Sequence, residues 1–309
     1  MKKKTKKRVI SIVISVVLSV ALCYGLISLT VLSVTREYLI SDEFNFTIEN
    51  TDLATLNFVY NGEKITLEKY VKDYVTENIE KHIRDNPLSN YTNIFYPFAD
   101  SITDFVVDKA LSSDFVNSTV KNQVRSIFEY LLNSDVKEAK QRIKDGVTLD
   151  ENYKLDPKNA PTFEERVSAE VKLAVFKHIE EESGMTTDEI IVLLSQETIS
   201  KLKMICVLLF IVLFALSIPE FPSILAYISF IFFGYKAGLY FMVNDFKENF
   251  VGNEDLISHQ LLKPLTDNFV SYADHAQSLA IICLLLFIVL FVVIHYMTKK
   301  KENKSTKKA

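Results

Sequence analysis

The chain has 309 residues, of which 49% are hydrophobic and 24% are charged. This length allows one or two domains, and the low counts of 7 glycines and 7 prolines exclude a collagen-like chain or a Gly/Pro-rich disordered one. The formal net charge of −4 is the sum of basic ends and strongly acidic internal segments.

Four apolar runs are long enough to cross a membrane, and no other stretch of the sequence approaches their length. A spanning helix needs about 20 predominantly apolar residues. We therefore predict transmembrane helices over 9–34, 202–217, 221–243 and 278–297, with a short cytoplasmic turn at 218–220.

The first apolar run follows a basic segment, 1–8, and a secretory signal peptide is the alternative to a membrane anchor here. The apolar core of a signal peptide spans about 7–15 residues and ends at a small-residue cleavage site. The run 9–34 is longer and continues into Thr35-Arg36-Glu37 without an A-x-A sequence. These features favour an uncleaved anchor.

The distribution of charge predicts the orientation in the membrane. The tail 1–8 holds six basic residues and no acid, and the tail 298–309 holds six basic residues and one acid. In contrast, 36–200 holds 31 acidic and 18 basic residues, and 245–276 holds six acidic and two basic residues. The positive-inside rule places basic flanks in the cytoplasm. We predict a multi-pass cell-membrane protein with both termini cytoplasmic and both acidic segments outside.

The cysteines agree with this orientation. Cys23, Cys206 and Cys283 all lie in predicted spans, so the extracytoplasmic domain over 35–200 contains none. Cysteine-free surface domains are typical of Gram-positive bacteria rather than of animal cells. The Lys-, Asn- and Ile-rich composition fits such a bacterial source.

Hydrophobic periodicity predicts a mainly helical domain over 35–200. The alternation at 56–60 before Asn61-Gly62 predicts one short hairpin. After the hairpin, apolar residues recur at three- and four-residue spacing, as in amphipathic helices. The predicted helices cover 67–83, 102–110, 116–143, 162–183 and a segment from 186 through 198 that continues into the second span.

Two capping boxes mark helix starts in this domain, at Thr162 with Glu165 and at Thr186 with Glu189. The helix that begins at Thr186 would couple the domain rigidly to the membrane. The second extracytoplasmic segment, 244–277, has apolar residues at helical spacing around Pro264. We predict a kinked amphipathic helix there that docks on the larger domain, since its acidic residues would be repelled by anionic lipid.

Lys236 is the one clear charge within a predicted span. An ionisable residue inside a membrane is a functional hypothesis by default. Three interpretations stay open: the side chain snorkels to the interfacial belt marked by Tyr235 and Tyr240, it packs against a buried acid or a carbonyl, or it takes part in transport. No acidic residue accompanies it inside any predicted span.

Small residues at four-residue spacing predict two close helix–helix contacts. Gly234 and Gly238 form a GxxxG pattern around Lys236, and Ser11, Ser15 and Ser19 repeat the spacing in the first span. Such patterns let helices approach closely. The spacing alone does not distinguish packing within one chain from self-association.

No catalytic, cofactor-binding or metal-binding motif is found. The chain lacks a P-loop, GxGxxG, GxSxG, HExxH and a kinase signature, and its five histidines do not reach ligand spacing. We therefore expect no enzyme, no cofactor and no metal. The basic tails indicate contact with anionic lipid rather than with nucleic acid.

We carry two main hypotheses for the function. The leading one is a non-enzymatic membrane protein whose acidic extracytoplasmic domain binds a protein or peptide partner at the cell surface, as an accessory subunit, a receptor or an immunity-type protein. The alternative is an oligomeric channel or transporter component, in which Lys236 supports a pathway. An enzyme acting on lipid or cell-wall substrates ranks third.

Overall fold

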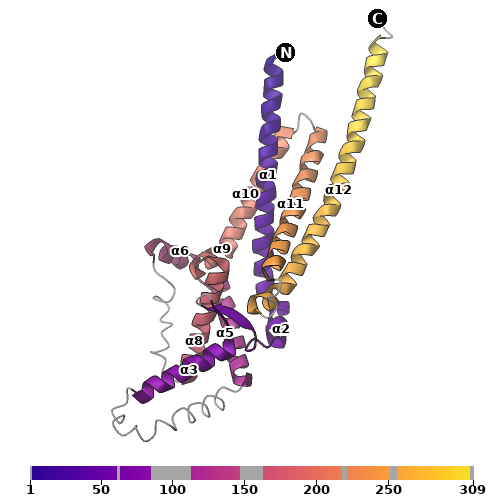
Figure 1. Cartoon of the computed structure of the whole chain (residues 1–309). Coiled ribbons are helices and arrows are strands. Elements are labelled where there is room, and N and C mark those ends of the chain that lie inside the picture. Colours follow the sequence, from indigo (N-terminus) through magenta and orange to yellow (C-terminus); the bar gives the residue numbers. More distant parts are fainter. Residues whose placement is uncertain are drawn as a thin grey trace. The chain divides into compact units, whose positions relative to one another are not determined.

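The computed structural model describes residues 2–60, 63–84, 113–146, 163–217, 221–250 and 256–306. The protein is mainly helical (Figure 1), and four long apolar helices are joined by further helices between the first and the second of them. The structure confirms the predicted fold class, a mainly α multi-pass membrane protein with a helical region after its first span.

The described part of the chain contains four helices that are long and apolar enough to span a membrane. A helix satisfies its own backbone hydrogen bonds, which the hydrocarbon core requires. The four candidate spans are Val9–Leu39 in α1 (Lys2–Leu39), Gln196–Ser217 in α10 (Gln196–Ser217), Pro222–Asp245 in α11 (Phe221–Phe250) and His259–Met297 in α12 (Ile257–Thr306). The predicted turn 218–220 lies outside the described residues.

The chain divides into two compact units. The first, here called the span unit, comprises Met1–Thr35, Gln196–Asn249 and Pro264–Ala309. The second, here called the inserted unit, comprises Arg36–Ser195 and Phe250–Lys263.

Apolar side chains hold the span unit together. One cluster joins α1, α10 and α11, and a second joins α11 and α12. Both termini lie at the same end of this unit (Figure 1), as an even number of membrane crossings requires. The buried members are Leu22, Cys206, Leu213 and Ile231 in the first cluster and Tyr235, Leu239, Ala273 and Ala276 in the second.

The inserted unit contains the predicted hairpin. Strand β1 (Asn57–Tyr60) pairs antiparallel with β2 (Glu63–Thr66), and Asn57 lies opposite Thr66. Helix α3 (Leu67–Arg84) follows β2 directly. The predicted turn residues, 61 and 62, lie outside the described residues, as do the predicted helix 102–110 and the cap at Thr162.

A short helix that was not predicted from the sequence, α2 (Asp42–Asn50), packs on the core of the inserted unit through its buried residues Phe44 and Ile48. The ring of Phe44 packs edge-on between Tyr38 and Phe128, with centroid distances of 5.4 and 5.0 Å. Phe128 belongs to α5 (Ser113–Asn133). Such edge-to-face pairs contribute roughly 0.5–1.5 kcal/mol each beyond their burial. They therefore hold the side of α2 that carries Phe44 against the core of the inserted unit.

Two predicted continuous helices are wrong. The helix predicted over 116–143 is interrupted after α5, and α6 (Val136–Asp145) begins behind Asp135, whose carboxylate accepts a hydrogen bond from the Lys137 N–H at 2.7 Å. The helix predicted from Thr186 into the second span is also interrupted: α9 (Thr187–Leu193) ends before Ser195, and α10 begins at Gln196. The periodicity continues across both interruptions, so it could not reveal them.

Two helix ends agree with the sequence. The capping box at Thr186 is confirmed: its hydroxyl accepts a hydrogen bond from the Glu189 N–H at 3.3 Å, and the Glu189 carboxylate accepts one from the Thr186 N–H at 2.8 Å. Helix α8 (Phe163–Ser183) ends before Gly184, which has φ +64°. This left-handed backbone favours glycine.

Helix α12 joins part of the predicted segment 244–277 to the fourth span, and it runs without interruption through Pro264. Proline removes one helical hydrogen bond, but Leu261 and Leu265 on its two sides are both buried. The residues before Pro264 belong to the inserted unit, where the Tyr38 hydroxyl donates a hydrogen bond to the Leu261 carbonyl at 2.5 Å. Packing on both sides of the proline therefore keeps the helix continuous.

Candidate functional site

Lys236 lies on α11, and its ammonium group is paired with side chains of α12. Its Nζ donates a hydrogen bond to Oε1 of Gln277 and lies 3.7 Å from Oδ1 of Asp274. The lysine side chain is 25% exposed. Neither partner was predicted from the sequence, since both lie ahead of the predicted fourth span, on the part of α12 that precedes it.

Tyr240, one turn after Lys236, completes this polar cluster of Lys236, Tyr240, Asp274 and Gln277. The tyrosine hydroxyl donates a hydrogen bond to Oδ1 of Asp274 at 2.9 Å. Its ring centroid lies 5.0 Å from the lysine Nζ, within the range of a cation–π contact. The cluster therefore ties α11 to α12 where the uncharged stretch of α12 begins. The Asp274 side chain is 58% exposed, so it is not the buried acid of the packing interpretation, and the pairing of Lys236 at this end of the span agrees with snorkelling.

The glycines beside Lys236 contact α1 of the same chain. A Cβ at Gly234 would lie 2.9 Å from Sγ of Cys23, and a Cβ at Gly238 would lie closer still to Cδ1 of Ile27. Such approaches are closer than a methyl group tolerates without movement of its neighbour. The GxxxG pattern thus serves packing within the chain.

The serines of α1 lie apart from the polar cluster. Ser15 and Ser19 are buried, and the Ser19 hydroxyl donates to the Ser15 carbonyl at 2.8 Å, while Ser11 is half-buried. In the described residues, the polar contacts of Lys236 come from α11 and α12 and not from these serines.

Other hydroxyl groups of the span unit also find partners inside it. The hydroxyls of Thr30 and Tyr235 lie 2.8 Å apart, which joins α1 to α11. Ser229 of α11 donates to the Ala280 carbonyl of α12 at 2.8 Å. These hydrogen bonds hold the helices of the span unit together.

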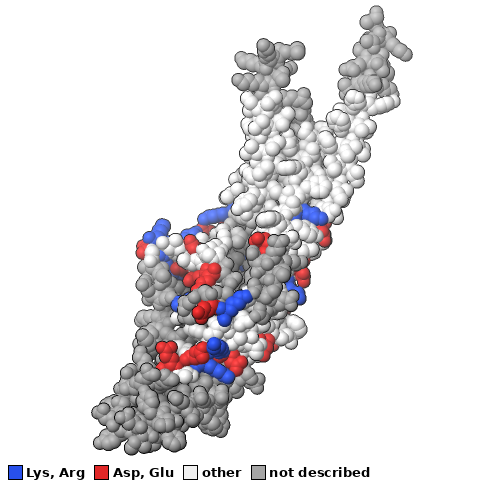
Figure 2. Space-filling model, viewed as in Figure 1, with Lys and Arg blue, Asp and Glu red and all other residues white. Residues whose placement is uncertain are grey.

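Charged residues gather on the inserted unit, whereas the long helices show few charges between their ends (Figure 2). On the inserted unit, α2 turns an acidic and apolar side to solvent. Phe46 is 69% exposed, and Ile40, which precedes the helix, is also exposed. Asp42 and Glu43 are exposed and lie four and three residues before Phe46, which makes them its neighbours on the helix. We call Ile40, Asp42, Glu43 and Phe46 the α2 face.

The sequence carried a signal for α2 that the periodicity analysis did not use. Ser41 precedes Asp42 and Glu43, and a serine followed by acids is a helix-start signal. In the structure, the Ser41 hydroxyl accepts a hydrogen bond from the Phe44 N–H at 3.2 Å. The helix is only 9 residues long, too short for an apolar stripe to stand out.

Arg36 lies at the end of α1 and caps two other helices of the inserted unit. Its guanidinium donates to the Leu132 carbonyl at 3.3 and 3.4 Å and to the Leu194 carbonyl at 2.9 Å. Those carbonyls lie at the ends of α5 and α9, where the two predicted helices are interrupted. A cation is favourable at a helix C-terminus, so one side chain stabilises both interruptions.

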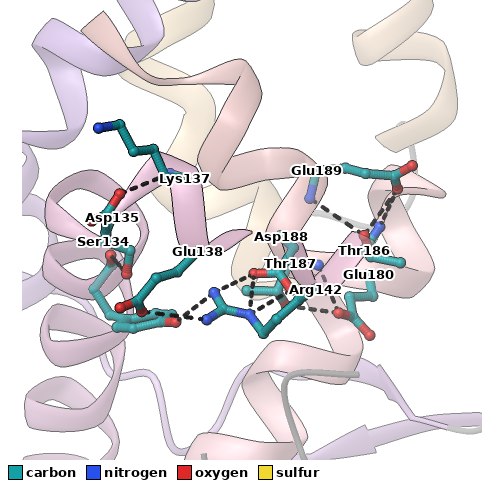
Figure 3. Close-up of polar contacts among 11 residues, drawn as sticks. Ser134, Asp135, Lys137, Glu138, Arg142, Glu180, Thr186, Thr187, Asp188 and Glu189 are labelled. Atoms are coloured by element: carbon teal, nitrogen blue, oxygen red, sulfur yellow. Dashed lines mark hydrogen bonds and ion pairs between the residues drawn. The ribbon is translucent and has the colours of Figure 1, made fainter. Parts of the chain in front are cut away.

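A buried ion pair joins α6 to α9 (Figure 3). The Arg142 guanidinium donates to both oxygens of Asp188, with the shortest distance 2.6 Å, and their side chains are 12% and 5% exposed. The hydrogen bond from Arg142 to Asp188 raises the pKa of that guanidinium above its ordinary value. Beside the pair, Glu180 accepts hydrogen bonds from the Thr187 N–H and hydroxyl, each at 2.7 Å. The pair is part of the fold rather than a reactive site.

Glu49 lies three residues after Phe46, on the same side of α2 as the α2 face, and its charge is paired with α5. The Arg125 guanidinium binds the Glu49 carboxylate, and this hydrogen bond lowers the pKa of Glu49. Lys121 donates to the Glu49 carbonyl at 2.6 Å. Asp42 and Glu43 lie in the first turn of α2, where the helix dipole favours acids, and no ion pair joins them to another residue that the structure describes.

In the part of the chain that the structure describes, no three His, Cys, Asp or Glu side chains gather as a metal site. Comparison with protein families, with curated proteins and with solved structures finds no match for this chain. The function is therefore inferred from the geometry of the chain itself.

Proposed function

We propose that this multi-pass membrane protein is not an enzyme and that its inserted unit lies outside the cytoplasm and binds a basic protein or peptide. The α2 face is the proposed contact. In this role the chain acts as an accessory subunit, a receptor or an immunity-type protein. The orientation rests on the basic tails, which the positive-inside rule assigns to the cytoplasm.

The observation that carries this proposal is the exposed ring of Phe46 beside two acids. The other aromatic side chain of α2, Phe44, is buried in the core, whereas the exposed ring of Phe46 takes no part in that core. Removal of such a side chain from water contributes about 1.5–3 kcal/mol. Aromatic residues are enriched in protein interfaces, and acids beside the ring favour a basic partner.

A lipid surface is the other occupant that an exposed ring at this position suggests. Residue 40 directly follows the candidate span that ends at Leu39, and apolar side chains at a bilayer surface insert between headgroups. Asp42 and Glu43 oppose this, because anionic headgroups repel them. Charge therefore favours a basic polypeptide.

The channel alternative has less support from the contacts of the span unit. Lys236 is paired with Gln277 and Asp274, and Tyr235 with Thr30. A pathway would need polar groups that are not committed to helix–helix contacts. If Lys236 does serve transport, Lys236→Met changes the flux or ion selectivity of the reconstituted protein.

Native mass spectrometry of the full chain, extracted gently from its own membranes, tests the proposal. We expect a stoichiometric polypeptide partner that is lost from Phe46→Asp. The matched control is Ile143→Asp, because Ile143, in α6, is another exposed large apolar side chain among the residues of the inserted unit that the structure describes. Retention of the partner by the control supports the α2 face. An assembly without a polypeptide partner, or equal loss in both variants, contradicts the proposal.

A further inference from the structure

Tyr24 places a hydroxyl group deep in the membrane. Its side chain is 73% exposed on α1, and no residue that the structure describes forms a hydrogen bond with it. Tyr24 lies 16 residues after Arg8 and 12 before Arg36, about 24 and 18 Å along a helix axis at 1.5 Å per residue. With a hydrocarbon core about 30 Å thick, the residue lies well inside it.

The side chain cannot easily reach the nearer membrane surface. Side chains of an α-helix lean toward the helix N-terminus. For Tyr24 that direction leads away from Arg36, the nearer charged residue, and toward the middle of the bilayer. Its hydroxyl group therefore lies in hydrocarbon, where a polar group without a hydrogen bond is unfavourable.

The residues around Tyr24 suit a helix–helix contact. Val17, Val20 and Ala21 are exposed and lie three to seven residues before it, on the same side of α1. Valine has a restricted χ1 and loses little side-chain entropy on packing, and alanine lets a second backbone approach. This side differs from the one that contacts Gly234 of α11 through Cys23.

We propose that two copies of this chain associate in parallel through one side of α1 that contains Val17, Val20, Ala21 and Tyr24. The two Tyr24 hydroxyl groups form a hydrogen bond with one another. All copies insert in the same orientation, so a parallel pair brings each Tyr24 to the depth of its counterpart. A phenol is both a donor and an acceptor, so at a two-fold contact one tyrosine hydroxyl donates to the other and each gains one hydrogen bond. The proposal is independent of the proposed function.

Cysteine cross-linking of the full chain in its own membranes tests this contact. In a background where Cys23, Cys206 and Cys283 are replaced by alanine, we compare Ala21→Cys with Leu285→Cys, which is also an exposed position on an apolar stretch, in α12. We expect a disulfide-linked dimer of the chain from Ala21→Cys and none above background from Leu285→Cys. Val17→Cys is the second probe if Ala21→Cys is not produced as folded protein.

The decisive variant adds Tyr24→Phe to the cross-linking background, because it removes the hydroxyl and keeps the ring. We expect the dimerisation constant to fall about threefold to tenfold, as for a single hydrogen bond between helices in a bilayer. Three results would overturn the proposal: equal cross-linking at positions 21 and 285, an unchanged constant in Tyr24→Phe, or cross-linking of α1 to a different protein.

Discussion

Removal of the guanidinium in Arg142→Met tests the ion pair that joins α6 to α9. The substitution leaves the Asp188 carboxylate 5% exposed and without its cation. Removal of one partner of a buried pair costs about 3–5 kcal/mol. Asp188 lies in the first turn of α9, where the helix dipole offsets about 0.3–1 kcal/mol of that cost. We expect a net loss of about 3 kcal/mol of local stability, within the range that these two effects give.

Hydrogen exchange of the full chain in lipid nanodiscs measures this loss. At about 1.4 kcal/mol per factor of ten, protection of the amides of α6 and α9 should fall about a hundredfold, while α11 stays unchanged. The matched control is the double variant Arg142→Met with Asp188→Leu, which leaves no buried charge and should recover most of the protection. A loss below about fivefold in the single variant, or an equally large loss in the double variant, would refute the reasoning.

Three further variants test other contacts of the structure. Arg36→Met removes the cap of two carbonyls, and we expect about 1.5–3 kcal/mol less local stability, seen as faster hydrogen exchange at the ends of α5 and α9; unchanged exchange would contradict the cap. Gly238→Ala places a methyl group against Ile27 and should lower the melting temperature of the purified protein. Adding Ile27→Val should restore part of that melting temperature, because valine lacks Cδ1. If the melting temperature does not recover, the clash is not with Ile27. Arg125 lowers the pKa of Glu49 from its ordinary value of 4.5. The stability that this pair contributes is therefore present above pH 4.5 and is lost as the pH falls through the lowered pKa. The variant Arg125→Met should lose less stability between pH 7 and pH 3 than the unchanged chain, and an identical pH profile would refute this.

The membrane-spanning part of the fold could be predicted because its signal is a property of the sequence alone. An uncharged run such as 9–34 has one stable solution in a bilayer, a helix. The capping box at Thr186 was equally visible, since both of its partners lie within four residues. Local chemistry of this kind needs no knowledge of the rest of the chain.

The interruptions of the two mispredicted helices depend on long-range contacts. Arg36 caps Leu132 and Leu194, which are 96 and 158 residues away in sequence. No local pattern announces such a partner, and the apolar periodicity runs on across both sites. The partners of Lys236 were missed for the same reason, because Gln277 is 41 residues away on another helix.

The candidate sites show the same limit. The spacing of Gly234 and Gly238 predicted close helix packing, but only the structure names α1 of the same chain as the neighbour. The α2 face could not be predicted either. The residue types of Phe44 and Phe46 are identical, and only the fold decides which ring is buried and which is exposed.

Photo-cross-linking from position 46 tests the central claim, that the α2 face binds a basic polypeptide. A photoreactive phenylalanine analogue replaces Phe46 in the full chain in its own membranes, and the same analogue at Ile143 is the control. We predict one polypeptide adduct from position 46, absent from position 143, whose yield falls as salt screens the charges of Asp42 and Glu43. Adducts with lipid alone, or no adduct at either position, would contradict the claim.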